Sequence, residues 1–158
     1  MPVFAQYPVP GGYDVNNTLT RFEGTWRWVN GQDTVWIYMQ KQKINYSEIP
    51  YDADKIVGWH KYKKGNVIVE SNYQFTGTSY NQQPGNVSLY CGNKPSIDPN
   101  FLEGMVTDIT KAKKVDLTLT LNAGQDQLQW KTTNPQGTKL RPYNYGYTLP
   151  TQMTLIKQ

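Results

Sequence analysis

One histidine and one cysteine are the side chains in this sequence with the most obvious capacity for catalysis. His60 lies in the run Gly-Trp-His-Lys-Tyr, and Cys91 precedes a glycine. No Gly-x-Ser-x-Gly or comparable nucleophile motif accompanies His60. Because Trp59 and His60 alternate on an expected strand and Lys61 follows, the imidazole is expected to face solvent. A lone cysteine at the end of a strand is typically a small buried apolar group. Single copies of each also exclude a disulfide framework, a cysteine-built zinc site and His-Glu-x-x-His zinc chemistry.

Three carboxylates follow one another in a segment that reads as a loop. Glu48, Asp52 and Asp54 lie within residues 44–55, which also contain Pro50. Calcium needs six to eight oxygen ligands, and the segment lacks the Asp-x-Asp-x-Asp-Gly pattern that supplies them. Solvated loop charges are therefore expected here, and the sequence indicates no metal site and no cofactor.

Three tyrosines alternate near the C-terminus. Tyr143, Tyr145 and Tyr147 lie between Arg141 and Pro150. In an extended segment their rings share one face, which would form a flat platform for sugars or aromatic ligands. The alternative is a closing loop whose rings cover the end of a barrel and whose hydroxyls bind nearby backbone.

The charge of the chain argues against a polyanionic partner. Lysine and arginine exceed aspartate and glutamate only by 16 to 12, which gives a net charge of +4. Two lysine clusters, at 61–64 and 111–114, fall at expected hairpin turns, where they also discourage edge pairing. We therefore expect no nucleic-acid binding, and no apolar run is long enough to span a bilayer.

The elements that must position these residues are strands. Apolar residues recur with a period of two from Phe22 onward, most cleanly at Leu117, Leu119 and Leu121, whereas no amphipathic helix exceeds two turns. About nine or ten short strands, separated by Gly, Pro and Asn, predict an all-β fold: a single antiparallel up-and-down barrel of about 8–10 strands, or alternatively a β-sandwich. Residues 21–158 are expected to form this one domain.

Part of the sequence is similar to a known β-barrel superfamily. Gly24-Thr25-Trp26 resembles the Gly-x-Trp element that opens the first strand in lipocalins, fatty-acid-binding proteins and avidins. The resemblance implies that Trp26 plugs one end of the barrel, beside Gly24, and that a late arginine packs across its ring. Arg141 is the candidate for that arginine. The second lipocalin signature, Thr-Asp-x-x-Tyr, is absent from residues 107–111.

A broader resemblance covers nearly the whole chain. The segments FEGTWRWVNG, IVGWHKYKKGNVIVES, LQWKTTNPQG and RPYNYGYTLP are similar to a family of small exported proteins of Bacteroidetes bacteria of the Flavobacterium type, to which no activity is assigned. The resemblance implies a signal peptide, and Val3-Phe4-Ala5 before Gln6 has the small-residue pattern of a signal-peptidase site. Residues 1–20 are thus expected to be a signal remnant and an extended leader of a periplasmic or secreted protein.

Two hypotheses for the function follow. The first is a non-enzymatic binding protein, a monomer or weak oligomer, that holds a small apolar or aromatic ligand in the barrel interior or mouth. The second is a cell-envelope interaction protein that binds a protein or glycan through exposed tyrosines and strand edges. Because no nucleophile, base and orienting group form a recognisable motif, an enzyme is not expected. Besides the three C-terminal tyrosines, the residues expected to line the ligand site are Trp28, Trp36, Tyr38 and Trp130.

Overall fold

The chain forms an antiparallel β-barrel with two small additions to one of its strands. The computed structural model describes residues 9–48, 50–93, 98–139 and 141–158. Its strands are β1 (Tyr13–Asp14), β2 (Gly24–Asn30), β3 (Asp33–Asn45), β4 (Asp52–Lys64), β5 (Val67–Ser71), β6 (Leu89–Gly92), β7 (Phe101–Asp108), β8 (Lys113–Leu121), β9 (Gln127–Thr133) and β10 (Gln152–Lys157). Its 3₁₀ helices are η1 (Asn17–Phe22), η2 (Tyr73–Phe75) and η3 (Pro84–Asn86).

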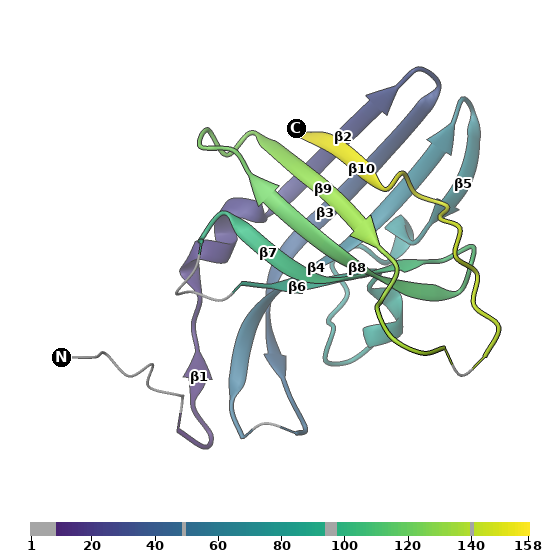
Figure 1. Cartoon of the computed structure of the whole chain (residues 1–158). Helices are drawn as coiled ribbons and strands as arrows, with labels where there is room; N and C mark the ends of the chain where they lie inside the picture. The colour runs from purple at the N-terminus through teal and green to yellow at the C-terminus, as the bar shows by residue number, and fades with distance from the viewer. Residues whose placement is uncertain (1–8, 49, 94–97, 140) are drawn as a thin grey trace.

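Each barrel strand pairs with its neighbours along the chain. The order runs β4-β3-β2-β10-β9-β8-β7-β6, and β6 returns to pair with β4, so eight strands in the described residues form a closed barrel (Figure 1). This confirms the predicted single up-and-down barrel. β5 pairs antiparallel with β4, and β1 pairs with β4 in parallel, both outside the closed ring.

Alternation of side chains explains the core. In β8, Val115, Leu117, Leu119 and Leu121 are at most 4% exposed and point inward, whereas Asp116 lies on the outer face. This agrees with the alternation read from the sequence. The inward rows form one continuous hydrophobic cluster.

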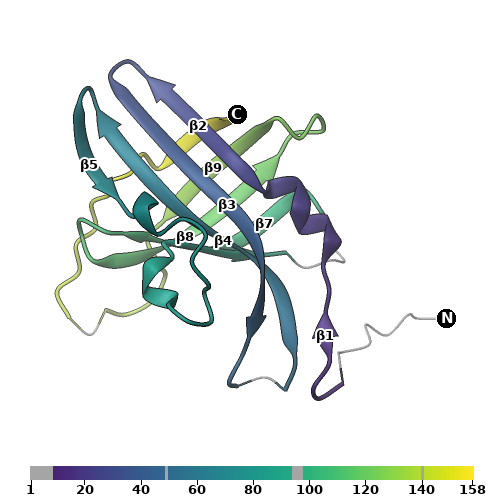
Figure 2. The same ribbon diagram turned by 180° about the vertical axis from the view of Figure 1, so that it is seen from behind.

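The strands β3 and β4 are covered on both faces. Their outward residues Tyr38 and Trp59 belong to a second hydrophobic cluster, and their rings lie 6.0 Å apart. The segment of residues 72–88, which joins β5 to β6, lies over this outer face (Figure 2). The near-continuous apolar character of β3 therefore has two separate causes, the barrel core and this outer cover.

A short 3₁₀ helix closes one end of the barrel. Asn16 caps η1 by accepting a hydrogen bond from the Thr18 amide, at 3.1 Å. Leu19 and Phe22 are 0% exposed, and the Phe22 carbonyl accepts a hydrogen bond of 2.9 Å from the Trp26 indole. Trp26 is itself fully buried, as the Gly-x-Trp resemblance implies.

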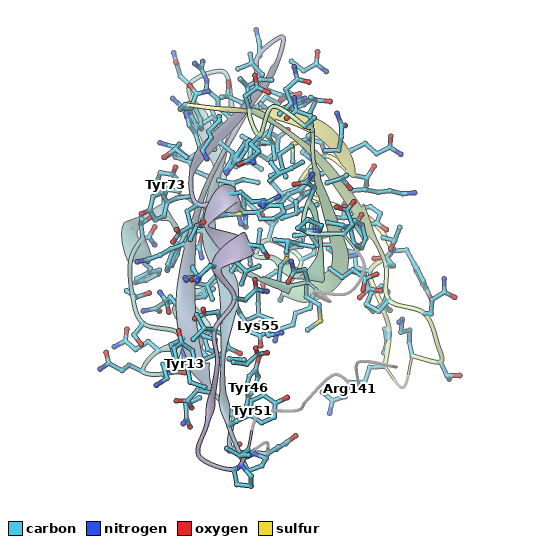
Figure 3. The ribbon with its side chains drawn as sticks, turned by 90° about the vertical axis from the view of Figure 1, so that its left-hand side faces the viewer. Tyr13, Tyr46, Tyr51, Lys55, Tyr73 and Arg141 are labelled. Carbon is cyan, nitrogen blue, oxygen red and sulfur yellow. The ribbon has the colours of Figure 1, made fainter. Side chains whose placement is uncertain are left out.

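The cation at Trp26 is not the expected one. Lys157 on β10 places its Nζ 5.2 Å from the centroid of the Trp26 ring and donates to the Arg21 carbonyl at 3.3 Å. Arg141 is instead exposed on the connection between β9 and β10, well away from η1 (Figure 3). The assignment of Arg141 to this packing position is therefore corrected, because the last strand, and not the segment before it, runs beside β2.

The described part of the leader is attached to the barrel. Tyr13 donates a hydrogen bond to the buried Asp54 carboxylate, and the Asn16 amide donates to the same group at 2.9 Å. Lys41 Nζ lies 3.4 Å from Asp54 Oδ2. Residues 1–8, with the expected signal-peptidase site, lie outside the described residues.

Gly104 allows β6 and β7 to approach closely. A bulge would be natural at a glycine inside a strand, but the pairing of Cys91 with Gly104 continues the ladder without a register shift. A Cβ at residue 104 would lie 2.0 Å from the Tyr90 carbonyl oxygen and 2.7 Å from the Cys91 Cα. The glycine is thus required by backbone contact.

We expect Gly104→Ala to lower the free energy of unfolding by about 3 kcal/mol, because the added methyl group meets backbone that cannot move aside. Gly85→Ala is the matched control, since nothing lies within 4 Å of its added Cβ, and its effect should stay within about 0.5 kcal/mol. Urea denaturation followed by tryptophan fluorescence measures both. Equal stabilities of the two variants would contradict this account.

Candidate ligand groove

A groove lies on the outside of the barrel, between the 72–88 segment and the sheet of β6, β7 and β8. Its volume is about 560 Å³, within the range of about 300–1,000 Å³ that is typical of small-molecule sites. We call it the outer groove. It is lined by Tyr46, Tyr80, Pro84, Gly85, Val87, Ser88, Leu89, Tyr90, Met105, Thr107 and Lys114.

The floor of the outer groove consists mainly of outward side chains. In β6, Leu89 and Cys91 point into the core, so Tyr90 between them faces outward. Ser88, just before β6, is only 5% exposed, and its hydroxyl is hydrogen-bonded to His60. Met105 pairs with Tyr90 in the ladder and is 39% exposed. The floor therefore offers an aromatic ring and a thioether to a ligand.

The wall is built from tyrosines. Tyr80 stacks on Tyr90, with ring centroids 5.1 Å apart and an interplanar angle of 30°. The hydroxyl of Tyr46, at the end of β3, is hydrogen-bonded to the hydroxyl of Tyr90. Gln42 fixes the wall to β3, because its side chain accepts from the Tyr80 amide at 2.9 Å and donates to the Thr78 carbonyl at 2.9 Å.

The charge of the outer groove comes from one lysine. Burial raises the pKa of Tyr90, and its hydrogen bond with Tyr46 raises it further. Burial also raises the pKa of Tyr46, so both phenols remain neutral near pH 7. Lys114 pairs with Thr107 across β7 and β8 and is the cation among the described lining residues. The groove is thus suited to a ligand that combines an aromatic part with a negative charge.

A buried polar network lies under the floor. His60 is 1% exposed and Glu70 is 5% exposed. His60 Nε2 lies 2.6 Å from Glu70 Oε1, and His60 Nδ1 lies 2.8 Å from the Ser88 hydroxyl. The other oxygen of Glu70 accepts from the Thr110 amide at 3.0 Å and from its hydroxyl at 2.7 Å. The solvent-facing orientation expected of His60 is therefore wrong, because its position in the ladder, opposite Ile37, turns the ring inward.

Glu70 is held in its ionised form. Burial alone would raise its pKa, but the hydrogen bonds from His60 and from the hydroxyl and amide of Thr110 outweigh burial, so the pKa lies below its ordinary value. The carboxylate thus joins β5 to the hairpin between β7 and β8.

Cys91 is a buried thiol without catalytic character. It is 0% exposed, and burial raises its pKa, so little thiolate is present at neutral pH. Asp52 and Asp54 lie on β4, and not in a loop. Within the described ranges, no three His, Cys, Asp or Glu side chains gather as a metal site.

The expected aromatic site residues separate into two groups. Trp130 is 2% exposed inside the barrel, and Trp28 packs partly buried against the same core. Trp36 and Tyr38 lie on the outer face of β3, opposite in direction to Val35 and Ile37, so they do not line the interior. Trp36 is flanked by Arg27 and Lys61, whose cationic groups lie 5.7 and 4.6 Å from its ring centroid.

Side chains fill the barrel interior and surround a small void within it. This void has a volume of about 10 Å³ and is lined in part by Val106, Val115 and Leu149, which suffices for about one water molecule. The ligand hypothesis therefore moves from the interior to the outer groove.

The three C-terminal tyrosines do not form a flat platform. Tyr143 and Tyr145 meet edge to face, with centroids 5.0 Å apart at 69°, whereas Tyr147 packs against the core and its hydroxyl accepts from the Asn134 amide at 2.7 Å. Lys113 Nζ lies between two of the rings, 4.9 Å from Tyr143 and 4.8 Å from Tyr147. Of the three rings, only Tyr147 packs against the barrel core, and Tyr145 is 66% exposed.

Most residues of the outer groove gave no signal in the sequence. Tyr46 and Tyr80 lie in a turn and a polar connection, and only folding brings them beside Tyr90. His60, Glu70 and Ser88 likewise share no motif. A weak signal existed in the polar 76–86 connection, which is unusually long for a barrel of short turns.

The fold and the groove define an up-and-down β-barrel protein with a cavity of about 560 Å³ on the outside of the barrel. The chain belongs to the family described as "Family of unknown function (DUF6705)", which it matches over residues 1–158. No curated protein and no solved structure matched the chain significantly. In the part of the chain described, no helix has the length and apolar character needed to cross a membrane.

We expect acid to weaken the contribution of Glu70 to stability. Because the folded chain lowers its pKa from the ordinary 4.5, this contribution is complete above about pH 4.5 and is lost as the pH falls through the folded value. Glu70→Gln should therefore cost about 2 kcal/mol at pH 7, because hydrogen bonds to a buried carboxylate are lost, and the difference from the parent protein should shrink below about pH 4.5.

Urea denaturation at a series of pH values tests this, with the exposed Glu103→Gln as the control. A difference for Glu70→Gln that stays constant down to about pH 3 would refute the charged role of Glu70.

Proposed function

We propose that the protein is an exported, non-enzymatic binding protein with a lipocalin-like barrel, and that it holds a small aromatic, negatively charged ligand in the outer groove. The observation that carries the proposal is the groove itself: about 560 Å³ of space lined by the stacked pair Tyr80 and Tyr90, with Lys114 also in its lining. Aromatic walls supply contact area at a low cost in conformational entropy, and one cation fixes the orientation of the ligand.

Rigid attachment of the wall supports the proposal. Besides Gln42, Asn81 donates to the Lys43 carbonyl at 2.9 Å and accepts from the Asn45 amide at 3.0 Å. The segment that carries Tyr80 is thus held in place before a ligand arrives, and pre-organisation of this kind lowers the cost of binding.

Export and a Bacteroidetes origin belong to the same proposal. They are supported by the small-residue pattern at Val3-Phe4-Ala5 and by the whole-chain resemblance to exported proteins of these bacteria. Fractionation of the source cells, with determination of the N-terminal residue of the mature protein, tests this part. A mature protein found in the cytoplasmic fraction would contradict it.

A pair of fluorescent probes tests the binding site. 1-Anilinonaphthalene-8-sulfonate and N-phenyl-1-naphthylamine share their aromatic rings, but only the first carries a negative charge. We expect Tyr80→Ala to weaken the binding of both probes, by about tenfold or about 1.4 kcal/mol. We expect Lys114→Gln to weaken the sulfonate by about fivefold and to leave the neutral probe within about twofold, because it removes only the charge.

Two control variants lie away from the groove lining. Lys131→Gln removes an exposed lysine of β9, and Tyr145→Ala removes a ring that is 66% exposed. Both should bind the two probes like the parent protein. Equal losses in the groove and control variants, or no saturable binding in the parent protein, would overturn the proposal.

A further inference from the structure

Two hairpins project side by side at one end of the barrel, one joining β2 to β3 and the other joining β4 to β5 (Figure 1). Their turns are tied together, because the Gly65 amide donates a hydrogen bond of 2.8 Å to the Gln32 carbonyl. Large aliphatic side chains near these turns lie in solvent: Val29 is 51% exposed, Ile68 is 58% exposed and Val67 is 67% exposed. Exposed apolar side chains that gather in one region mark an interaction surface.

Outward side chains form two rows across the strands that lead to these turns. The first row consists of Ile156, Arg27, Trp36, Lys61 and Ser71, each paired with the next across neighbouring strands. The second row lies two residues nearer to the turns and consists of Val29, Thr34, Lys63 and Ile68. Both rows face outward, because Val35 and Ile37, which alternate with them on β3, are buried in the core. We call the surface formed by the two rows the basic face.

Neither row of the basic face contains a carboxylate. Two acidic residues lie at this end of β3 and β5, but both turn away from the face. Asp33 accepts a hydrogen bond of 3.0 Å from the Tyr62 hydroxyl, and Glu70 is only 5% exposed. The small net charge of +4 therefore hides an uneven distribution, because three cations share this face without an acidic residue between them.

Two of these cations flank the ring at the centre of the basic face. The Arg27 guanidinium lies 5.7 Å and the Lys61 ammonium 4.6 Å from the centroid of the Trp36 ring. They come from β2 and β4, on either side of β3. Lys61 also lies 5.1 Å from the centroid of the Tyr73 ring. The aromatic rings thus hold the charged groups in place at the surface, and the flanked Trp36 ring has little free area on which a sugar could stack.

We propose that the basic face docks onto the anionic surface of a lipid bilayer, with the aliphatic side chains near the two turns entering the headgroup region. Charge complementarity and apolar exposure carry the inference together, since anionic headgroups attract the cations and the apolar side chains leave water. An acidic glycan would use the cations but not Val29 and Ile68. A second copy of the chain would bring the cations of two faces together. The inference goes beyond the proposed function and does not depend on a ligand in the outer groove.

Sedimentation of the full-length protein with vesicles tests the proposal. We expect vesicles of phosphatidylcholine with about 30% phosphatidylglycerol to bind the protein at least about tenfold more tightly than vesicles of phosphatidylcholine alone. Binding should fall steeply between about 0.1 M and about 1 M salt, because the Debye length shortens from about 10 Å to about 3 Å. Equal binding to both kinds of vesicle, or binding to neither, would overturn the proposal.

Single charge removals locate the contact. Arg27→Gln and Lys63→Gln should each weaken binding to the anionic vesicles by about fivefold, because each basic residue near a membrane surface contributes about this factor. Lys43→Gln is the matched control. It removes the same charge from the other end of β3, where Lys43 is exposed and lies 2.9 Å from Asp52, and it should stay within about twofold of the parent protein. Losses as large in the control as in the two face variants would count against the basic face.

A pair of valines tests the apolar part of the contact. Val29→Asn should weaken binding to the anionic vesicles by about threefold, because its side chain no longer gains by leaving water. Val15 lies in the leader, outside the basic face, and is 52% exposed, close to the 51% of Val29. Val15→Asn should therefore bind like the parent protein, and equal binding by both variants would show that no apolar insertion occurs.

Two results would assign the basic face to a different partner. Saturable binding to alginate, a polyuronate, that Lys63→Gln weakens and Val29→Asn does not would indicate an acidic glycan. A dimer in analytical ultracentrifugation that Ile68→Asn dissociates would indicate a second copy of the chain. Either result, in a protein without preference for anionic vesicles, would overturn the membrane proposal. Circular dichroism of every variant establishes that it is folded.

Discussion

One edge of β4 pairs with two different strands, and this fork determines the rest of the molecule. Along its first edge, β4 pairs with β3 over all 13 of its residues. Along the other edge, residues 56–58 pair with β6, whereas residues 61–64 pair with β5. The barrel closes only through the first of these pairings. Where β6 and β5 diverge, the backbone of β4 at His60 must find partners other than a regular strand.

The buried polar network supplies hydrogen-bond partners at the point where β5 and β6 diverge. The His60 amide donates to the Asn72 side chain, and the His60 carbonyl accepts from the Asn72 amide at 3.1 Å. Buried backbone groups without partners cost free energy comparable to a lost hydrogen bond. A side chain with both a donor and an acceptor can replace a strand at this point. His60 and Glu70 fill the space between the diverging strands, and Thr110 connects this filling to the β7–β8 hairpin. Ser88, which precedes β6, joins the same network, with its hydroxyl 2.8 Å from His60 Nδ1.

The alternation of residues was sufficient to predict the fold but not the site. The period of two in β8 and the buried Trp26 depend on local pattern and on one short motif, so they could be read from the sequence. The fork could not, because it depends on which strand β4 pairs with at each residue. For the same reason His60 was expected to face solvent. Its sequence neighbours are compatible with either face, and only the pairing with Ile37 determines which face it takes.

The position of Lys157 shows a similar limit. The resemblance predicted an arginine over the tryptophan, with Arg141 as the candidate, whereas the cation at the ring is Lys157. Arg141 was chosen because it is a late arginine, whereas the ladder brings β10 beside β2 and places Lys157 opposite Trp26. The Lys157 ammonium lies 5.2 Å from the centroid of the Trp26 ring and donates to the Arg21 carbonyl, so it takes the place of the expected arginine at the closed end of the barrel. The residue that contacts Trp26 is therefore determined by strand pairing and not by residue type.

The groove lies outside the barrel because side chains occupy the barrel interior. Trp26 and Trp130 occupy the interior together with Phe22, and each is at most 2% exposed. An eight-stranded barrel has an interior just wide enough for side chains or for one small ligand, and here side chains take that space. The 72–88 segment instead provides space for a ligand, because it is a long connection that lies over the sheet without pairing with it. Where this cover extends from β4 toward β7, the sheet beneath it bears Tyr90 and Met105, and the space between cover and sheet is the groove. A site of this kind uses the barrel as a rigid support and leaves its core intact.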